Sequence, residues 1–149
     1  MTQGAGGEVE AQEDLAILHR HYDSIEQFVE RMNRYTTNQA KMRVKEGYKF
    51  LWKDIISKPL EEFFSRYFFG YGYLDGIHGL AVSALQGFSE LVLYLKIWQI
   101  EKFVDEEIKV SDVISVMNIE EKSLHFWQND ALYKETGNLV ARIKRKLRI

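Results

Sequence analysis

Hydrophobic residues recur every three or four positions between Ser24 and Gly47, which is the spacing of an amphipathic helix. Ser24 followed by Gln27 has the form of a capping box, and Gly47 is a typical helix stop. This segment therefore predicts a helix with one apolar face. The apolar positions are Ile25, Phe28, Val29, Met32 and Tyr35.

Two further helices are predicted between Gly47 and the middle of the chain. Pro59 suits the first turn of a helix that continues through an aromatic segment to Gly70. Asp75 is expected to cap a long helix that extends to about Phe103, because a carboxylate at this position accepts backbone N–H bonds. The two helices would meet as a hairpin.

The same patterns divide the chain into four parts. Residues 1–14 are acidic and expected to be flexible, and residues 15–23 alternate in hydropathy, which predicts a short strand without a partner. Residues 24–104 are predicted to form the helical hairpin or a small bundle. Residues 105–149 are predicted to be a helical tail, broken near Gly137, with a basic end. The predicted fold class is mainly α, with amphipathic helices.

Seven of the eleven residues from Phe63 to Tyr73 are aromatic. Such rings fill the core of a helical domain or lie at a boundary between water and an apolar phase, and the pattern leaves both interpretations open. The rings expected to contact a membrane are Phe63, Phe64, Phe68 and Phe69. The residues expected to contact an acceptor or an interface are Arg66, Tyr67, Tyr71, Tyr73, Asp75 and His78.

The segment from Ile77 to Trp98 is the longest apolar stretch of the chain. It carries His78, Gln86, Glu90 and Lys96, which recur at spacings of four to eight. A spanning helix needs roughly 18 or more uncharged residues, so this pattern indicates burial against protein or a bilayer surface instead.

Composition and charge narrow the class of protein. The chain has 149 residues and a net charge of −2, which excludes a generally basic nucleic-acid binder. It has no cysteine, and its small, acidic start differs from a signal peptide, so we expect a cytoplasmic protein. The basic end, ARIKRKLRI, contributes Arg142, Lys144, Arg145, Lys146 and Arg148. These cations would attract an anionic membrane by about 1 kcal/mol each, or offset a helix dipole by about 0.3–1 kcal/mol each.

The sequence contains none of the common catalytic motifs. A phosphate-binding GxxxxGK[ST], a zinc-binding HExxH, a nucleophilic GxSxG, a dinucleotide GxGxxG and a metal-binding Asp-x-Asp are all missing. His19 and His21 are the only close histidine pair, and two residues alone make an incomplete metal site. We therefore predict that this chain binds no cofactor and is inactive by itself.

Three segments, SIEQFVERMNRYT, KPLEEFF and GYLDGIHGL, resemble the C-terminal part of bacterial family 2 glycosyltransferases of the envelope or lipopolysaccharide-core type. The resemblance covers roughly Gly7 to Phe103. It implies a preceding nucleotide-sugar domain with an Asp-x-Asp motif and a bound Mg²⁺ or Mn²⁺, neither of which this chain contains. His19 falls where some members place a histidine near the metal-diphosphate, which implies a metal-binding role for it.

The resemblance also implies a function for the helices. The full-length enzyme would transfer a sugar from a nucleotide diphosphate to a glycan or lipid-linked acceptor, and the helices would dock it on the acceptor side or at the inner face of the cell membrane. The alternative is a stand-alone, non-catalytic module that binds a membrane surface or another protein. Self-assembly of a helical domain is a third interpretation.

Overall fold

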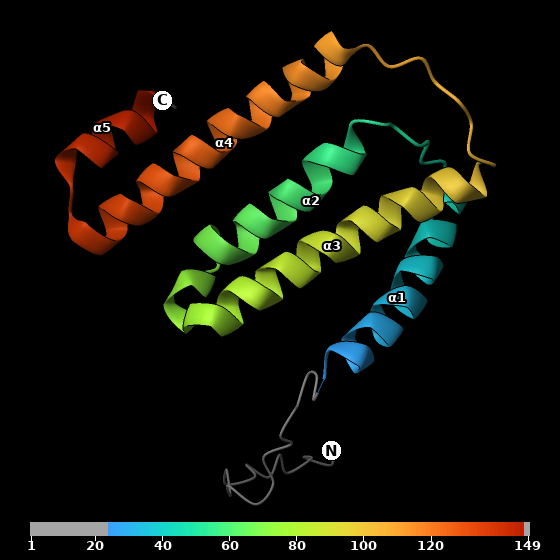
Figure 1. Ribbon diagram of the computed structural model, residues 1–149, viewed down its shortest axis with the longest axis horizontal. Coiled ribbons are helices and arrows are strands. Elements are labelled where there is room, and N and C mark those ends of the chain that lie inside the picture. The colour runs from blue at the N-terminus through green and yellow to red at the C-terminus, as the bar shows by residue number, and fades with distance from the viewer. Residues whose placement is uncertain (1–23, 148–149) are drawn as a thin grey trace, which may run out of the picture.

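The computed structural model describes residues 24–147, and Figure 1 shows their arrangement. Of these residues 82% are helical and none lies in a strand, so the prediction of a mainly α fold is confirmed. The acidic start, the predicted strand over 15–23 with His19, and Arg148 lie outside the described residues.

Five α-helices make up most of the described chain: α1 (Ile25–Lys45), α2 (Asp54–Phe64), α3 (Gly76–Ile100), α4 (Val110–Thr136) and α5 (Leu139–Leu147). A π-helix (Ser65–Phe69) and a 3-10 helix (Gly72–Asp75) connect α2 to α3. Helices α2 and α3 run antiparallel as a hairpin, α1 packs on α3, α4 packs on α2, and α5 folds back on α4 (Figure 1).

The first predicted helix is confirmed at both ends. The Ser24 hydroxyl accepts a hydrogen bond from the Gln27 amide at 3.2 Å, and Gly47 adopts a φ of +92° just beyond the last turn. The buried face differs from the prediction, because Ile25, Val29 and Tyr35 are exposed. The contacts with the other helices use a single i, i+4 row instead, which consists of Phe28, Met32, Thr36 and Ala40.

The main core forms where α1 meets the C-terminal half of α3. Its fully buried members are Ala40, Leu93, Tyr94 and Ile97, and Tyr48 packs against them from the chain that follows α1. The Arg43 guanidinium donates a 2.5 Å hydrogen bond to the Tyr94 hydroxyl. This contact satisfies a polar group that would otherwise be buried without a partner.

The second helix begins earlier than predicted, so Pro59 lies inside it and not in its first turn. Two tight turns start α2 before the proline, since the amides of Asp54 and Ile55 donate to the carbonyls of Leu51 and Trp52. The Asp54 carboxylate also accepts a hydrogen bond from the Tyr48 hydroxyl. These nonlocal and turn contacts carry no strong sequence signal.

Helices α2 and α3 approach each other closely because α3 presents small residues to α2. A Cβ atom added to Gly79 would lie 1.8 Å from the Gly72 carbonyl oxygen, and one added to Gly87 would lie 2.8 Å from that of Pro59. No side chain fits at Gly79 without moving the backbone of the connection. The hairpin tip is therefore packed backbone against backbone.

Candidate functional site

The connection between α2 and α3, Ser65–Asp75, is called the aromatic turn here, and its backbone is irregular throughout. It combines the π-helix, the 3-10 helix and a left-handed Tyr71 with a φ of 60°. A π-helical turn and a non-glycine residue at positive φ are both uncommon and occur more often at functional positions. The backbone thus marks the hairpin tip as a candidate site.

The rings of this segment pack largely on one another. Phe63 stacks on Tyr67 with centroids 5.4 Å apart, and Tyr67 meets Phe68 edge to face at 5.1 Å. Phe64 is only 6% exposed, so its predicted membrane contact is wrong for this structure, because it packs inside the helical layer. Phe69, at 63% exposed, lies at the accessible edge.

The aromatic turn contacts α4, more than fifty residues later in the chain. Phe69 meets Trp127 edge to face with centroids 5.9 Å apart, and the Lys134 ammonium lies 4.9 Å from the centre of the Tyr71 ring. These contacts bring the aromatic segment and the C-terminal part of the chain to the same end of the molecule (Figure 1).

Asp130 joins α5 to this end. Its carboxylate, in a residue only 6% exposed, is 2.8 Å from the Lys134 ammonium and 2.6 Å from the Arg145 guanidinium. Burial favours the neutral acid, but hydrogen bonds from Lys134 and Arg145, together with their charges, outweigh it and hold the pKa of Asp130 below its ordinary value. Arg145 is therefore engaged within the protein.

Helix α5 presents an apolar side and free cations to the surroundings. Ala141 is buried against the rest of the protein, whereas Lys144 and Lys146 are exposed and Arg142 lies 5.8 Å from the Tyr133 ring. Its exposed apolar residues are Leu139, Val140, Ile143 and Leu147. An amphipathic helix with both sides accessible is typical of attachment to a membrane surface.

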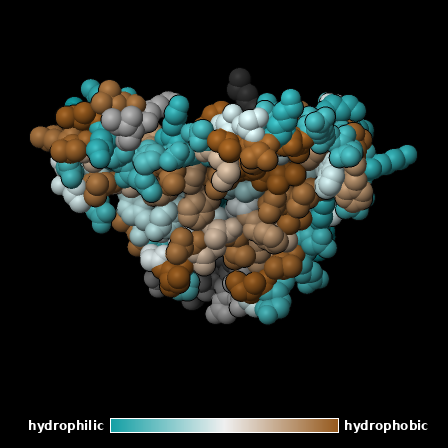
Figure 2. Space-filling view, turned by 45° about the horizontal axis from the view of Figure 1, so that its top comes forward, coloured by the Kyte–Doolittle hydropathy of each residue, from teal (hydrophilic) through white to brown (hydrophobic). Residues whose placement is uncertain are grey.

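Helix α3 carries an extended exposed apolar surface. From Leu80 to Leu95 every exposed residue of α3 is apolar, whereas the charged Glu90 and Lys96 are half-buried. We call the outward row at three- and four-residue spacing the α3 stripe, which consists of Ile77, Leu80, Ala81, Ala84, Phe88 and Leu95. Figure 2 shows hydrophobic residues gathered over the middle of one face of the molecule, with hydrophilic residues along its upper rim.

By length and composition alone, the helical segment 72–100 could cross a membrane, with a mean hydropathy of 1.3 over its most apolar window. Only 28% of that window is buried within the protein. The core helix of a water-soluble bundle would be mostly buried, and the α3 stripe is instead exposed in this structure.

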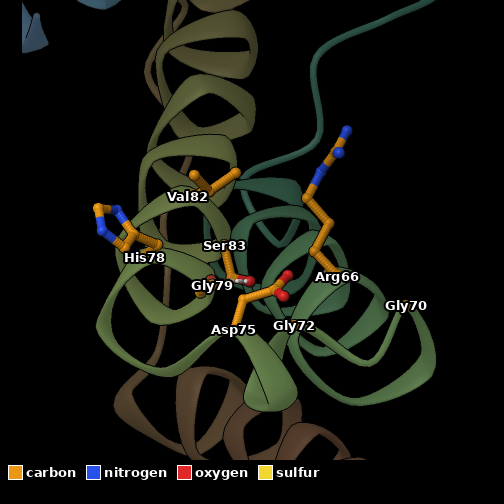
Figure 3. Close-up of a pocket in the computed structure, with 8 residues that line it drawn as sticks. All are labelled: Arg66, Gly70, Gly72, Asp75, His78, Gly79, Val82 and Ser83. Atoms are coloured by element: carbon orange, nitrogen blue, oxygen red, sulfur yellow. Dashed lines mark hydrogen bonds between the residues drawn. The ribbon is translucent and has the colours of Figure 1, made fainter. Parts of the chain in front are cut away.

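A pocket of about 520 Å³ opens at the hairpin tip. It brings together three of the predicted contact residues, Arg66, Asp75 and His78, whereas Tyr67, Tyr71 and Tyr73 do not line it. In Figure 3 the Asp75 carboxylate points into the space beside Gly72, while the His78 ring points away. The hydroxyl of Ser83, which also lines the pocket, donates to the Gly79 carbonyl at 2.7 Å.

Asp75 occupies the N-cap position of α3, as predicted, but its carboxylate makes no capping hydrogen bond. The predicted capping role is therefore wrong, because the side chain faces the pocket. The Arg66 guanidinium is paired with Glu62 at 2.5 Å. The pocket thus offers a carboxylate that is free to accept hydrogen bonds from a ligand, beside a guanidinium already held by Glu62.

Among residues 24–147, no group of three or more histidine, aspartate or glutamate side chains could hold a metal ion. The described helices therefore do not fit the Mg²⁺ or Mn²⁺ that the resemblance implies for a full-length enzyme. His19 lies outside the described residues.

No protein-family model, curated protein or solved structure matches the chain. The resemblance to family 2 glycosyltransferases rests on the sequence segments given above.

Sequence reasoning did not find Trp127, Asp130 or Lys134, which connect the aromatic turn to α5. Asp130 and Lys134 do have a local signal, since opposite charges at i and i+4 on a helix form ion pairs. Their contacts with Tyr71 and Arg145 depend on how the helices pack, which no local pattern shows.

Proposed function

We propose that this chain is a membrane-docking module of a family 2 glycosyltransferase, which holds the enzyme at the inner face of the membrane near a glycan or lipid-linked acceptor. The observation that carries the docking function is the α3 stripe, an exposed apolar row without a charged residue from Ile77 to Leu95. At about 1.5 Å per residue this row is about 27 Å long.

The packing of α1 indicates how α3 would meet a bilayer. The Lys96 ammonium donates to Asn33 and Thr36, and Tyr94 accepts from Arg43, so these two polar side chains of α3 face α1. The exposed residues of α1 include charged ones such as Arg34. If α3 crossed the membrane, α1 would be drawn in with it, at about 2.5–3.5 kcal/mol for each central charge.

We therefore place α3 in the plane of the membrane surface, with its stripe against the lipid and α1 on the water side. The exposed rings at Phe69 and Tyr71 lie in the connection that precedes α3, and the amphipathic α5 packs on α4, which contacts that connection; both would add further contacts. Aromatic and basic residues at such positions are typical of interfacial helices. The tip pocket with Asp75 and His78 would then face the acceptor.

Flotation with phosphatidylglycerol vesicles tests the docking surface. The double variant Ala84→Glu with Phe88→Glu places two carboxylates on the stripe, where both native residues are exposed. We expect it to keep the parent's melting temperature and to lose flotation. Asn38→Glu, on the exposed side of α1, is the matched control and should float like the parent.

Two results would contradict the proposal. The stripe variant could float as well as the parent, which would mean that α3 does not touch the lipid. The parent itself could fail to float, which would mean that the α3 stripe contacts a protein partner and not lipid.

The alternative function is a non-catalytic module that binds another protein or a second copy of itself. Ala81 and Ala84 favour it, because small residues in the middle of an apolar row allow another helix to approach closely. Sedimentation without lipid separates the two functions. A mass that rises with protein concentration, and that the stripe variant abolishes, would support self-association.

A further inference from the structure

A second pocket, of about 320 Å³, lies between α1 and the C-terminal end of α3. Its lining residues are either cationic or uncharged, and they include two lysines, Lys41 from α1 and Lys96 from α3. Asn33, Thr37 and Gln99 add amide and hydroxyl groups. A pocket with two ammonium groups and no carboxylate in its wall differs from the tip pocket, which contains Asp75.

In the described part of the chain, neither lysine has a counter-ion. Within the described chain no carboxylate lies within ion-pair distance of Lys41 or Lys96. The Lys96 ammonium contacts only neutral oxygens, at 2.6 Å from the Asn33 carbonyl and 2.8 Å from the Thr37 hydroxyl. Burial lowers the pKa of Lys96, and no neighbouring acid offsets this effect.

The nearest acid along the chain is already engaged elsewhere. The Glu101 carboxylate accepts a hydrogen bond through Oε2 from the Phe50 amide at 3.3 Å. Its buried Oε1 has no hydrogen-bond partner and lies 3.9 Å from the Lys49 ammonium. Backbone carbonyls at the end of α3 are also hydrogen-bonded. Those of Ile97 and Gln99 accept hydrogen bonds from the backbone amides of Glu101 and Lys102. Among residues 24–147, no carboxylate is therefore paired with Lys41 or Lys96.

Asn33 is oriented by Lys96. Its side-chain oxygen accepts from the Lys96 ammonium at 2.7 Å, which leaves the amide NH₂ as a donor at the pocket wall. The donors that remain for a ligand are this amide, the Gln99 amide and the Lys41 ammonium. Several donors beside an uncompensated charge suit an anion with several oxygens.

The position of the pocket indicates which anion it meets. Gln99 and Ile100 line the pocket, and they follow Leu95 at the C-terminal end of the α3 stripe. With the stripe on a membrane, this pocket would lie beside lipid headgroups, where lysines next to an apolar surface extend toward phosphates.

We propose that the pocket between α1 and α3 binds a phosphate group, with Lys41 as a direct ligand and the half-buried Lys96 as the counter-charge. If the proposed membrane docking holds, the phosphate belongs to a lipid headgroup. Only this assignment to a headgroup rests on the proposed docking function. A free phosphate would use the same donors.

The test is a titration of the full 149-residue chain, followed by NMR of the Asn33 and Gln99 side-chain amides. One probe is inorganic phosphate, with chloride at equal ionic strength as its control. The other is dihexanoyl phosphatidylglycerol below its micelle concentration, with dihexanoyl phosphatidylcholine as its control. We expect the NMR signals of these amides to shift to saturation with inorganic phosphate or with phosphatidylglycerol, whose phosphate groups bear a net negative charge. Lys41→Gln should bind these probes about fivefold more weakly than the parent.

Lys41 is exposed, so this variant should fold, and a thermal melt verifies that it does. Lys109→Gln removes an exposed lysine at the start of α4 and should bind like the parent. Saturation by the lipid alone assigns the pocket to headgroups, and saturation by inorganic phosphate assigns it to a soluble anion as well. If neither probe saturates, or if Lys41→Gln binds as tightly as Lys109→Gln, the site does not exist.

These soluble probes need no vesicle, which separates this proposal from the docking function. Loss of flotation with an intact titration would overturn docking and keep the phosphate site. Intact flotation without a saturable titration would overturn the phosphate site alone.

Discussion

Asp130 joins α5 to α4 through an ion pair with Arg145. It accepts hydrogen bonds from Lys134 and Arg145, and Lys134 in turn lies over Tyr71. We expect Asp130→Asn to lower the free energy of unfolding by about 1–3 kcal/mol, since it leaves two cations without their shared partner. Urea denaturation measures the loss, and Asp112→Asn, at an exposed position in the same helix, is the control.

The contribution of Asp130 should depend on pH. Because the folded pKa lies below the unfolded value of about 3.9, the stabilisation is fully present above that value and is lost as pH falls through the folded pKa. The difference in stability between the parent and Asp130→Asn should therefore be constant from about pH 5 upward. A difference that already declines near pH 6 would show that the ion pairs do not hold this pKa down.

At Gly79 we expect a glycine-to-alanine substitution to change stability in the opposite direction from usual. Replacing glycine by alanine inside a helix normally stabilises it by about 1 kcal/mol. Here the added Cβ would meet the Gly72 carbonyl oxygen at 1.8 Å, so Gly79→Ala should instead destabilise the protein by about 1–3 kcal/mol. Denaturant unfolding decides the sign, and Ala81→Gly, exposed on the same helix, calibrates the helix propensity.

The burial of single residues was only partly predictable from the sequence. Phe64 and Phe69 are the same residue type in one aromatic run, yet the first is buried and the second exposed. The difference arises from the side on which α3 and α4 pack, and this is set by residues such as Gly79 and Trp127 that are distant in sequence. Local patterns cannot supply it.

At the scale of elements, the sequence predicted the helices whose ends have local signals. Ser24, Gly47 and Gly137 end or begin helices as expected, because caps and left-handed turns depend on one or two residues. The early start of α2 before Pro59 and the π-helix were missed. Both depend on hydrogen bonds to the preceding loop and on packing against α3.

Helix α5 supplies the electrostatic part of the proposed docking. The triple variant Arg142→Gln, Lys144→Gln and Lys146→Gln removes its accessible cations and leaves the Asp130–Arg145 pair in place. At about 1 kcal/mol for each cation, binding to phosphatidylglycerol vesicles should weaken by up to about 100-fold at low salt. Binding to phosphatidylcholine vesicles should not change.

Vesicle sedimentation measures both affinities for the parent and the triple variant. An equal loss on the two kinds of vesicle would mean that the substitutions disturb α5 itself. If the triple variant binds phosphatidylglycerol vesicles as tightly as the parent, these cations do not contact lipid and only offset the dipole at the end of the helix.

At the scale of the whole molecule, we expect this chain to bind no nucleotide sugar. The sequence lacks an Asp-x-Asp motif, and the described helices offer no group of metal-binding side chains. Calorimetry with Mn²⁺ and a panel of nucleotide-diphosphate sugars should give no heat of binding. Micromolar affinity for any of these donors would assign a catalytic role to the helices and overturn their interpretation as a docking module.

Salt should separate the two forces that hold the molecule on a membrane. The apolar contribution of the α3 stripe and of Phe69 does not depend on ionic strength, whereas the attraction of α5 fades as the Debye length falls from about 10 Å at 0.1 M to about 3 Å at 1 M. Flotation of the parent should therefore weaken with salt and level off above zero. The triple variant should show the residual binding at every salt concentration, so the two proteins should converge near 1 M. Complete release of the parent at 1 M would mean that cations alone hold it, and that the α3 stripe is covered by something other than lipid.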